Sequence, residues 1–161
     1  MVAAESAGRP RIVVGVDGSP PSQAAFRWAV GQARLTGGEV LAVTAWHLPV
    51  AYGYPMPVAP LTDAMHIAKR VLETATDEIL QEPGEPVQIT GTVLEGNAAR
   101  VLLDASQDAD LLVVGNRGHG GFVEALLGST GQHLVEHATC PVVVIRGENK
   151  DHSDRNGDAA G

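Results

Sequence analysis

The chain has 161 residues, of which 44% are hydrophobic and 4% aromatic, and its formal net charge is −8. This length predicts one domain, and the scarcity of aromatic residues means that aliphatic side chains must build the core, which suits a parallel sheet buried on both faces. The negative charge and the absence of any run of basic residues argue against nucleic acid or an anionic membrane surface as a partner.

The two ends of the sequence differ from its middle. Residues 1–10 and 147–161 are aperiodic, so we expect disordered tails on either side of one folded domain at residues 11–146. Residues 1–10 lack the apolar segment of a signal peptide, and no apolar stretch approaches the ~18 residues that span a bilayer. Cys140 is the single cysteine, so no disulfide can form within the chain, and we expect a soluble cytoplasmic protein.

Between these tails, apolar runs alternate with helical patterns. In chain order, the predicted elements are a strand at residues 12–16, a helix starting at residue 20, a strand at 40–46, a helix at 62–81, a strand at 87–94, a helix after residue 97, a strand at 111–115, a helix near 129–137 and a strand at 142–145. Ser19 and Asn97 are predicted N-caps of the first and third helices. Trp28 shares a helical stripe with Ala25 and Ala29, which predicts that it faces the core.

Regular alternation of strands and helices predicts a Rossmann-like α/β fold. Crossover connections place parallel strands in one doubly wound sheet with helices on both faces, and five strands suit the order 3-2-1-4-5. Residues 87–94 alternate between apolar and polar, as expected of an edge strand. Ligands of such sheets bind beyond the carboxyl ends of the strands where the order reverses, here after Val16 and Val114.

Glycine-rich segments follow both of these strands. Asp17 and Gly18 come after the first strand, residues 115–121 (GNRGHGG) come after the fourth, and a helix is predicted to begin near Ser129. Glycines let backbone N–H groups approach a phosphate, and a helix N-terminus adds unpaired N–H groups and the positive end of its dipole. The glycines alone are equally consistent with plain turns, but their place between a strand and a helix favours an anion site. Val16, Val43 and Ala45 are expected to line a slot for an adenine base.

The pattern Gly115-x2-Gly118-x9-Gly128-Ser129 matches the nucleotide-binding signature of the universal stress protein family. Residues 14–19 (VGVDGS) resemble the first strand and turn of that family, and residues 138–146 (ATCPVVVIR) resemble its closing strand. The resemblance covers residues 11–146. It implies the doubly wound fold and the binding of ATP, since members with the full signature typically bind it.

The resemblance also implies roles for individual residues. Gly118, Gly128 and Ser129 would contact phosphates, Asp17 would lie near the ribose and help to hold Mg²⁺ or Mn²⁺, and the backbone of Ala45 would contact adenine. Arg117 and His119 either pair with a phosphate or are solvated. The full set of candidate nucleotide-binding residues is Val16, Asp17, Ala45, Gly115, Arg117, Gly118, His119, Gly128, Ser129 and Thr130.

The sequence contains no recognisable catalytic set. It has neither a GxxxxGK[ST] phosphate loop nor a GxSxG nucleophile motif, so slow ATP hydrolysis is the most that we expect. His133 and His137 are four residues apart, but without an HExxH pattern or a cysteine pair they favour an exposed helix face over a metal site.

The resulting hypothesis is an ATP-binding stress-response sensor or regulator. It is expected to form a homodimer through the apolar strand at residues 142–145, since that strand should lie at a sheet edge and the family commonly pairs there. The alternatives are a protein that binds cyclic AMP or AMP, a slow ATP hydrolase, and an interaction protein with an empty site. The sequence leaves open the role of the proline-rich residues 47–60.

Overall fold

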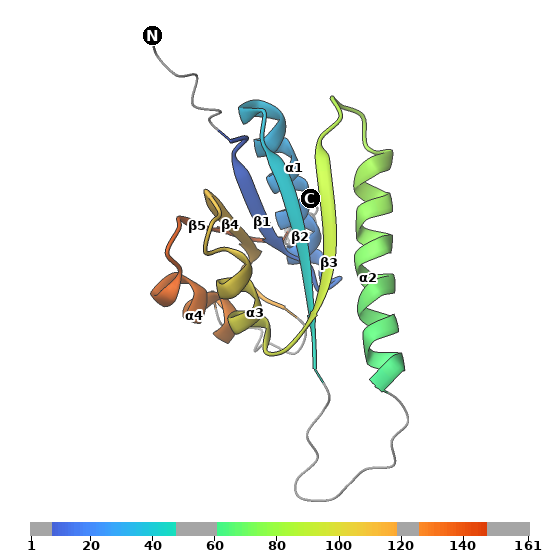
Figure 1. The fold of residues 1–161 in the computed structure, drawn as a ribbon, viewed down its shortest axis with the longest axis vertical. Coiled ribbons are helices and arrows are strands. Elements are labelled where there is room, and N and C mark those ends of the chain that lie inside the picture. The colour runs from blue at the N-terminus through green and yellow to red at the C-terminus, as the bar shows by residue number, and fades with distance from the viewer. Residues whose placement is uncertain (1–7, 48–60, 119–125, 148–161) are drawn as a thin grey trace, which may run out of the picture.

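The computed structural model of the chain describes residues 8–47, 61–118 and 126–147. Their elements are β1 (Arg11–Gly15), α1 (Pro20–Thr36), β2 (Glu39–Trp46), α2 (Leu61–Gln81), β3 (Gln88–Glu95), α3 (Ala98–Ala105), β4 (Leu111–Gly115), α4 (Ser129–His137) and β5 (Val142–Ile145). All strand pairs are parallel, in the order β3-β2-β1-β4-β5 (Figure 1). The predicted fold class and strand order are therefore confirmed. Most of the expected tails and of the proline-rich segment lies outside the described residues, and those expectations stay predictions.

The sheet is buried on both sides, because successive residues of its strands enter different cores. Ile12 and Val14 of β1 pack with α1 and α2, whereas Val13 packs with α3 and α4. Figure 1 shows this division, with α1 and α2 on one side of the sheet and α3 and α4 on the other. Aliphatic residues dominate both cores, with Phe26 as the one aromatic member among the buried residues that the structure describes. This arrangement leaves the carboxyl ends of β1 and β4 open between the two helical layers.

The ends of α1 follow from its sequence. The Ser19 hydroxyl accepts a hydrogen bond from the Ser22 N–H at 3.4 Å, as predicted for an N-cap. Gly37 has a φ of 67°, the left-handed conformation that ends a helix and that glycine adopts without strain.

One expectation for α1 is wrong. Trp28 is 37% exposed rather than part of the core. The buried stripe instead runs through Ser22, Ala25, Phe26, Ala29, Val30 and Ala33. Phe26 and Val30 supply the apolar bulk that packs with the sheet residues of this core, and Trp28 is not part of it.

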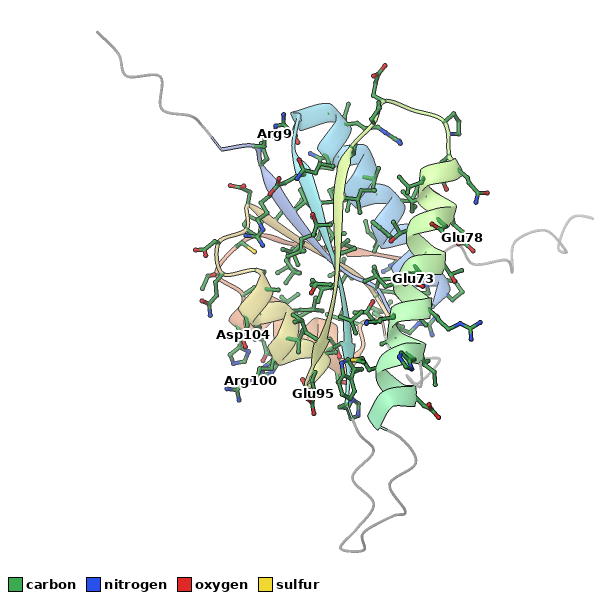
Figure 2. All side chains as sticks on the ribbon, turned by 45° about the vertical axis from the view of Figure 1, so that its right-hand side comes forward. Arg9, Glu73, Glu78, Glu95, Arg100 and Asp104 are labelled. Atoms are coloured by element: carbon green, nitrogen blue, oxygen red, sulfur yellow. The ribbon has the colours of Figure 1, made fainter. Side chains whose placement is uncertain are left out.

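Charged residues lie on the outer faces of the helices. Glu73 and Glu78 lie on α2, and Arg100 and Asp104 project outward from α3 (Figure 2). Within the described residues, no helix is both long and apolar enough to cross a bilayer.

Candidate functional site

A cavity of about 210 Å³ lies beyond the carboxyl ends of β1 and β4, where the strand order reverses. All of the predicted site residues that the structure describes line this cavity, namely Val16, Asp17, Ala45, Gly115, Arg117, Gly118, Gly128, Ser129 and Thr130. His119 lies outside the described residues. The fold thus brings together segments that are more than 100 residues apart in the chain, while their role in binding a ligand stays a prediction.

The β1–α1 turn holds Asp17 in a defined position. One carboxylate oxygen of Asp17, Oδ1, accepts hydrogen bonds from the Ser19 N–H at 2.9 Å and from the Ser19 hydroxyl. The Asp17 N–H donates to the Ser22 hydroxyl at 3.3 Å. Ser22 was not among the predicted site residues, although it follows Ser19 in the first turn of α1. These bonds connect the carboxylate to the start of α1.

The loop after β4 passes directly against this carboxylate. A Cβ added to Gly118 would lie 2.6 Å from Asp17 Oδ2, which is closer than two non-bonded atoms can come. Gly115 is similarly restricted, since a Cβ there would lie 2.7 Å from the backbone carbon of Pro21. Gly115 is therefore restricted by the backbone of α1, and Gly118 by the Asp17 carboxylate in its present position.

The N-terminus of α4 carries no side-chain cap. Its N-cap residue is Gly128, and the first helical hydrogen bond runs from the Gln132 N–H to the Gly128 carbonyl at 3.0 Å. The N–H groups of Ser129, Thr130 and Gly131 consequently have no acceptor within the helix. By contrast, side chains cap α1 and α3, where the Asn97 Oδ1 accepts from the Ala99 N–H at 3.0 Å. The uncapped turn of α4 borders the cavity and offers backbone donors to an anion.

Gly128 itself has a different role from Ser129 and Thr130. Its N–H donates to the Asn116 carbonyl at 2.8 Å, so this group is already used within the protein. The predicted contact of Gly128 with a phosphate therefore has to be one of close approach, made possible by its missing side chain.

The opposite end of the cavity is apolar. It is lined by Val43 of β2, by Ala45 at the end of the same strand, and by Ala98 and Leu102 of α3. A hydrogen bond of 2.8 Å from the Thr44 hydroxyl to the Val16 carbonyl fixes the ends of β1 and β2 against each other. The sequence had indicated Val43 and Ala45, whereas the contribution of α3 depends on how that helix packs over β2. Such a lining suits a flat, largely apolar group such as a nucleobase.

Few ionisable groups line this cavity within the described residues. Among the described residues that line it, the ionisable side chains are Asp17 and Arg117, with no lysine, histidine or cysteine. The described residues contain no group of three or more histidine, cysteine, aspartate or glutamate side chains placed to hold a metal ion. His133 and His137 stack on the exposed face of α4, with ring centroids 4.2 Å apart.

A doubly wound parallel sheet with a glycine-lined cavity at its switch point defines the class of α/β nucleotide-binding folds. Residues 8–146 match the universal stress protein family, and the chain belongs to this family. A universal stress protein of Mycolicibacterium smegmatis is 35% identical over 159 residues, which cover 93% of this chain and 52% of the relative. The chain spans about half the length of the curated relatives that it matches.

Solved structures agree with this assignment at the level of the fold. A universal stress protein in complex with cyclic AMP superimposes with a TM-score of 0.66 and 22% identity, over 88% of this chain and 100% of that one. A universal stress protein family member from Arabidopsis thaliana with AMP bound gives a TM-score of 0.59 and 20% identity, over 91% of this chain and 97% of that one. Both of those proteins bind adenine nucleotides.

Proposed function

We propose that the cavity binds an adenine nucleotide, that this nucleotide is ATP, and that the complex acts as a regulator in a stress response. The observation that carries the proposal is the uncapped N-terminus of α4, which borders a cavity lined by glycines at one end and by aliphatic side chains at the other. Phosphates meet the first end and adenine the second. Two proteins of related fold hold cyclic AMP or AMP, which supports an adenine nucleotide as the ligand.

Micromolar binding of a nucleotide requires contacts at both ends of the cavity. A helix dipole contributes roughly 0.3–2 kcal/mol to the binding of an anion, whereas micromolar affinity corresponds to about 8 kcal/mol. Most of the binding free energy must therefore come from direct hydrogen bonds to the Ser129, Thr130 and Gly131 N–H groups and from burial of the base. Burial of apolar surface contributes about 25 cal/mol per Å².

A divalent cation fits this scheme. The chain carries a formal charge of −8, and Asp17 places a carboxylate beside Gly118, so a polyphosphate would meet negative charge on entering. Mg²⁺ is commonly held by one or two carboxylates together with phosphate oxygens and water. Asp17 is the residue that would hold Mg²⁺ or Mn²⁺, and the ion would neutralise charge between the carboxylate and the phosphates.

The lining of the cavity supports regulation rather than catalysis. A general base for activating water would be an imidazole, a carboxylate or an amine within hydrogen-bond reach of the reacting oxygen. Asp17 is the carboxylate among the described lining residues, and its Oδ1 is used by Ser19. We therefore expect phosphate release from ATP to remain near the uncatalysed rate with either Mg²⁺ or Mn²⁺, and turnover well above that rate would favour the hydrolase alternative.

The outer edge of β5, which pairs with no strand within the described residues, supports a homodimer as the acting form. This strand pairs with β4 on one side, ends the sheet on the other, and carries four aliphatic residues, Val142–Ile145. An apolar edge of this kind invites pairing with a second strand. Two copies related by a two-fold axis would extend both sheets.

Side-by-side titration calorimetry tests the choice of ligand. ATP, cyclic AMP, AMP and adenosine are titrated separately into nucleotide-free protein with Mg²⁺ present. The proposal expects ATP to bind most tightly, because it offers the most phosphate oxygens to the α4 donors and to the cation. Tighter binding of cyclic AMP or AMP would transfer the proposal to that nucleotide, and the absence of binding by all four would contradict it.

A further inference from the structure

Asn116 connects three parts of the site. It is the first residue after β4, and its N–H donates to the Ile145 carbonyl of β5 at 2.8 Å. Its own carbonyl accepts the Gly128 N–H at 2.8 Å. The backbone of Asn116 therefore joins the end of the sheet to the N-cap of α4.

The side chain adds a third connection. The Asn116 Nδ2 donates to the Leu126 carbonyl at 3.3 Å, two residues before Gly128. The opposite orientation of the amide would set two acceptor oxygens, Oδ1 and the Leu126 carbonyl, against each other, so this hydrogen bond fixes the assignment. The side chain is 9% exposed, which makes it one of the few buried polar groups of the described residues.

The other polar atom of the Asn116 amide, Oδ1, is not stabilised by a hydrogen bond from any residue that the structure describes. Asn116 Oδ1 is buried and has no hydrogen-bond partner within the described part of the chain. A buried acceptor without a partner destabilises the folded state. An aliphatic residue of similar size would avoid this cost, so the structural value of the amide lies in its hydrogen bond to the Leu126 carbonyl.

From these contacts we infer that Asn116 is a positioning residue for the phosphate end of the site. By tying Leu126 and Gly128 to the end of β4, it sets the distance between the N–H groups at the start of α4 and the loop of Gly118. The inference rests on the proposed nucleotide-binding function. It assigns to Asn116, which occupies a variable slot of the signature, the task of matching these donors to the phosphates, while the base end is left to Val43, Ala45 and α3.

Asn116→Ala, measured against a ligand series, tests this assignment. Adenosine, AMP, ADP and ATP are titrated into the wild type and the variant with Mg²⁺ present. Adenosine affinity is expected to stay within about twofold of the wild type, and ATP affinity to fall by about five- to tenfold, with AMP and ADP between them. The loss should grow with the number of phosphates, which a general loosening of the fold would not produce.

Two further variants separate the hydrogen bond from other effects. Asn116→Leu keeps most of the volume and removes the donor, so it should lose as much ATP affinity as Asn116→Ala while unfolding at no lower temperature than the wild type. Asn97→Ala removes a matched asparagine that caps α3 at the base end, and it should affect adenosine and ATP alike.

The outcomes are distinct. Unchanged ATP affinity in Asn116→Ala, full affinity in Asn116→Leu, or an equal loss for adenosine and ATP would each overturn the inference while leaving nucleotide binding intact. If the wild type binds none of the four ligands, the proposed function fails and the inference fails with it.

Discussion

Gly118 and Gly128 both line the candidate phosphate site and differ in the space around them. A Cβ at Gly118 would lie 2.6 Å from Asp17 Oδ2, whereas the nearest atoms to a Cβ at Gly128 are the Asn116 carbonyl oxygen at 3.7 Å and Arg117 Cα at 3.8 Å. A side chain at the first position requires the Asp17 carboxylate to move, whereas the second position has room for a methyl group.

This difference predicts unequal effects of the same substitution. Gly118→Ala must displace the Asp17 carboxylate from its bonds with Ser19, so we expect a loss of ~1 kcal/mol in the free energy of unfolding and at least a tenfold loss of ATP affinity. Gly128→Ala should change the free energy of unfolding by less than ~1 kcal/mol, the usual range for an N-cap glycine. Urea denaturation and calorimetry measure both quantities. An equal loss of stability in the two variants would contradict the described approach of Gly118 to Asp17.

Asp17→Asn isolates the effect of charge. Asparagine keeps an oxygen that can accept the Ser19 N–H, so the turn should fold, but the negative charge that would hold a cation is gone. We predict that Mg²⁺ increases the affinity of the wild type for ATP and has several-fold less effect on the variant. Titrations with Mg²⁺ and with a metal chelator provide the comparison. The same Mg²⁺ dependence in both proteins would remove Asp17 from the cation site.

Substitution of two glycines that lie within secondary-structure elements is predicted to have opposite effects on stability. Gly31 lies within α1, and a Cβ there meets nothing within 4 Å, whereas a Cβ at Gly115 would lie 2.7 Å from the Pro21 backbone. Gly31→Ala should raise the free energy of unfolding by ~0.5–1 kcal/mol because alanine restricts the unfolded chain and favours the helix. Gly115→Ala should lower it by ~1–3 kcal/mol through overpacking. Chemical denaturation measures both values, and a stabilised Gly115→Ala variant would show that β4 and α1 do not approach as described.

The elements show where sequence patterns suffice. The bounds of β4, α4 and β5 agree with the expected ones, since β4 follows the largely polar residues 106–110, α4 begins directly after Gly128, and β5 begins directly after Pro141. The prediction that Trp28 faces the core fails because several neighbouring sets of residues in α1 have helical spacing. Packing of Phe26 against the sheet, which is a tertiary effect, decides between them.

The candidate site likewise contains residues that the sequence predicts and residues that only the tertiary structure reveals. Its glycines and Asp17 could be predicted, because positions where the backbone must approach a neighbouring group closely are occupied by glycine, and such glycines are recognisable in the sequence. Asn116 could not, since an asparagine in a loop is ordinary and its value lies in contacts with Leu126, Gly128 and Ile145. The place of Leu102 at the base end follows from the packing of α3, which a sequence pattern does not give.

At the scale of the whole molecule, β5 provides a test of the homodimer. The Leu112 N–H donates to the Pro141 carbonyl and the Asn116 N–H donates to the Ile145 carbonyl. The backbone N–H and C=O groups of every second residue of β5 therefore point toward β4, and the N–H of Val144 points toward the outer edge of the sheet. Val144→Pro would remove this outward N–H while leaving the ladder with β4 in place.

We expect Val144→Pro to fold as a monomer at concentrations where the wild type is a dimer. Analytical ultracentrifugation gives the masses, and circular dichroism reports on the fold. A folded variant that remains dimeric would exclude main-chain pairing at the edge of β5 as the contact.

The central claim is that the start of α4 binds the phosphates of an adenine nucleotide. The most direct measurement is a titration of ¹⁵N-labelled protein with MgATP, followed by NMR through the backbone amides. The account predicts saturable shifts concentrated at Ser129, Thr130 and Gly131, which adenosine does not reproduce. Saturable binding of ATP that leaves these three amides unchanged would contradict it.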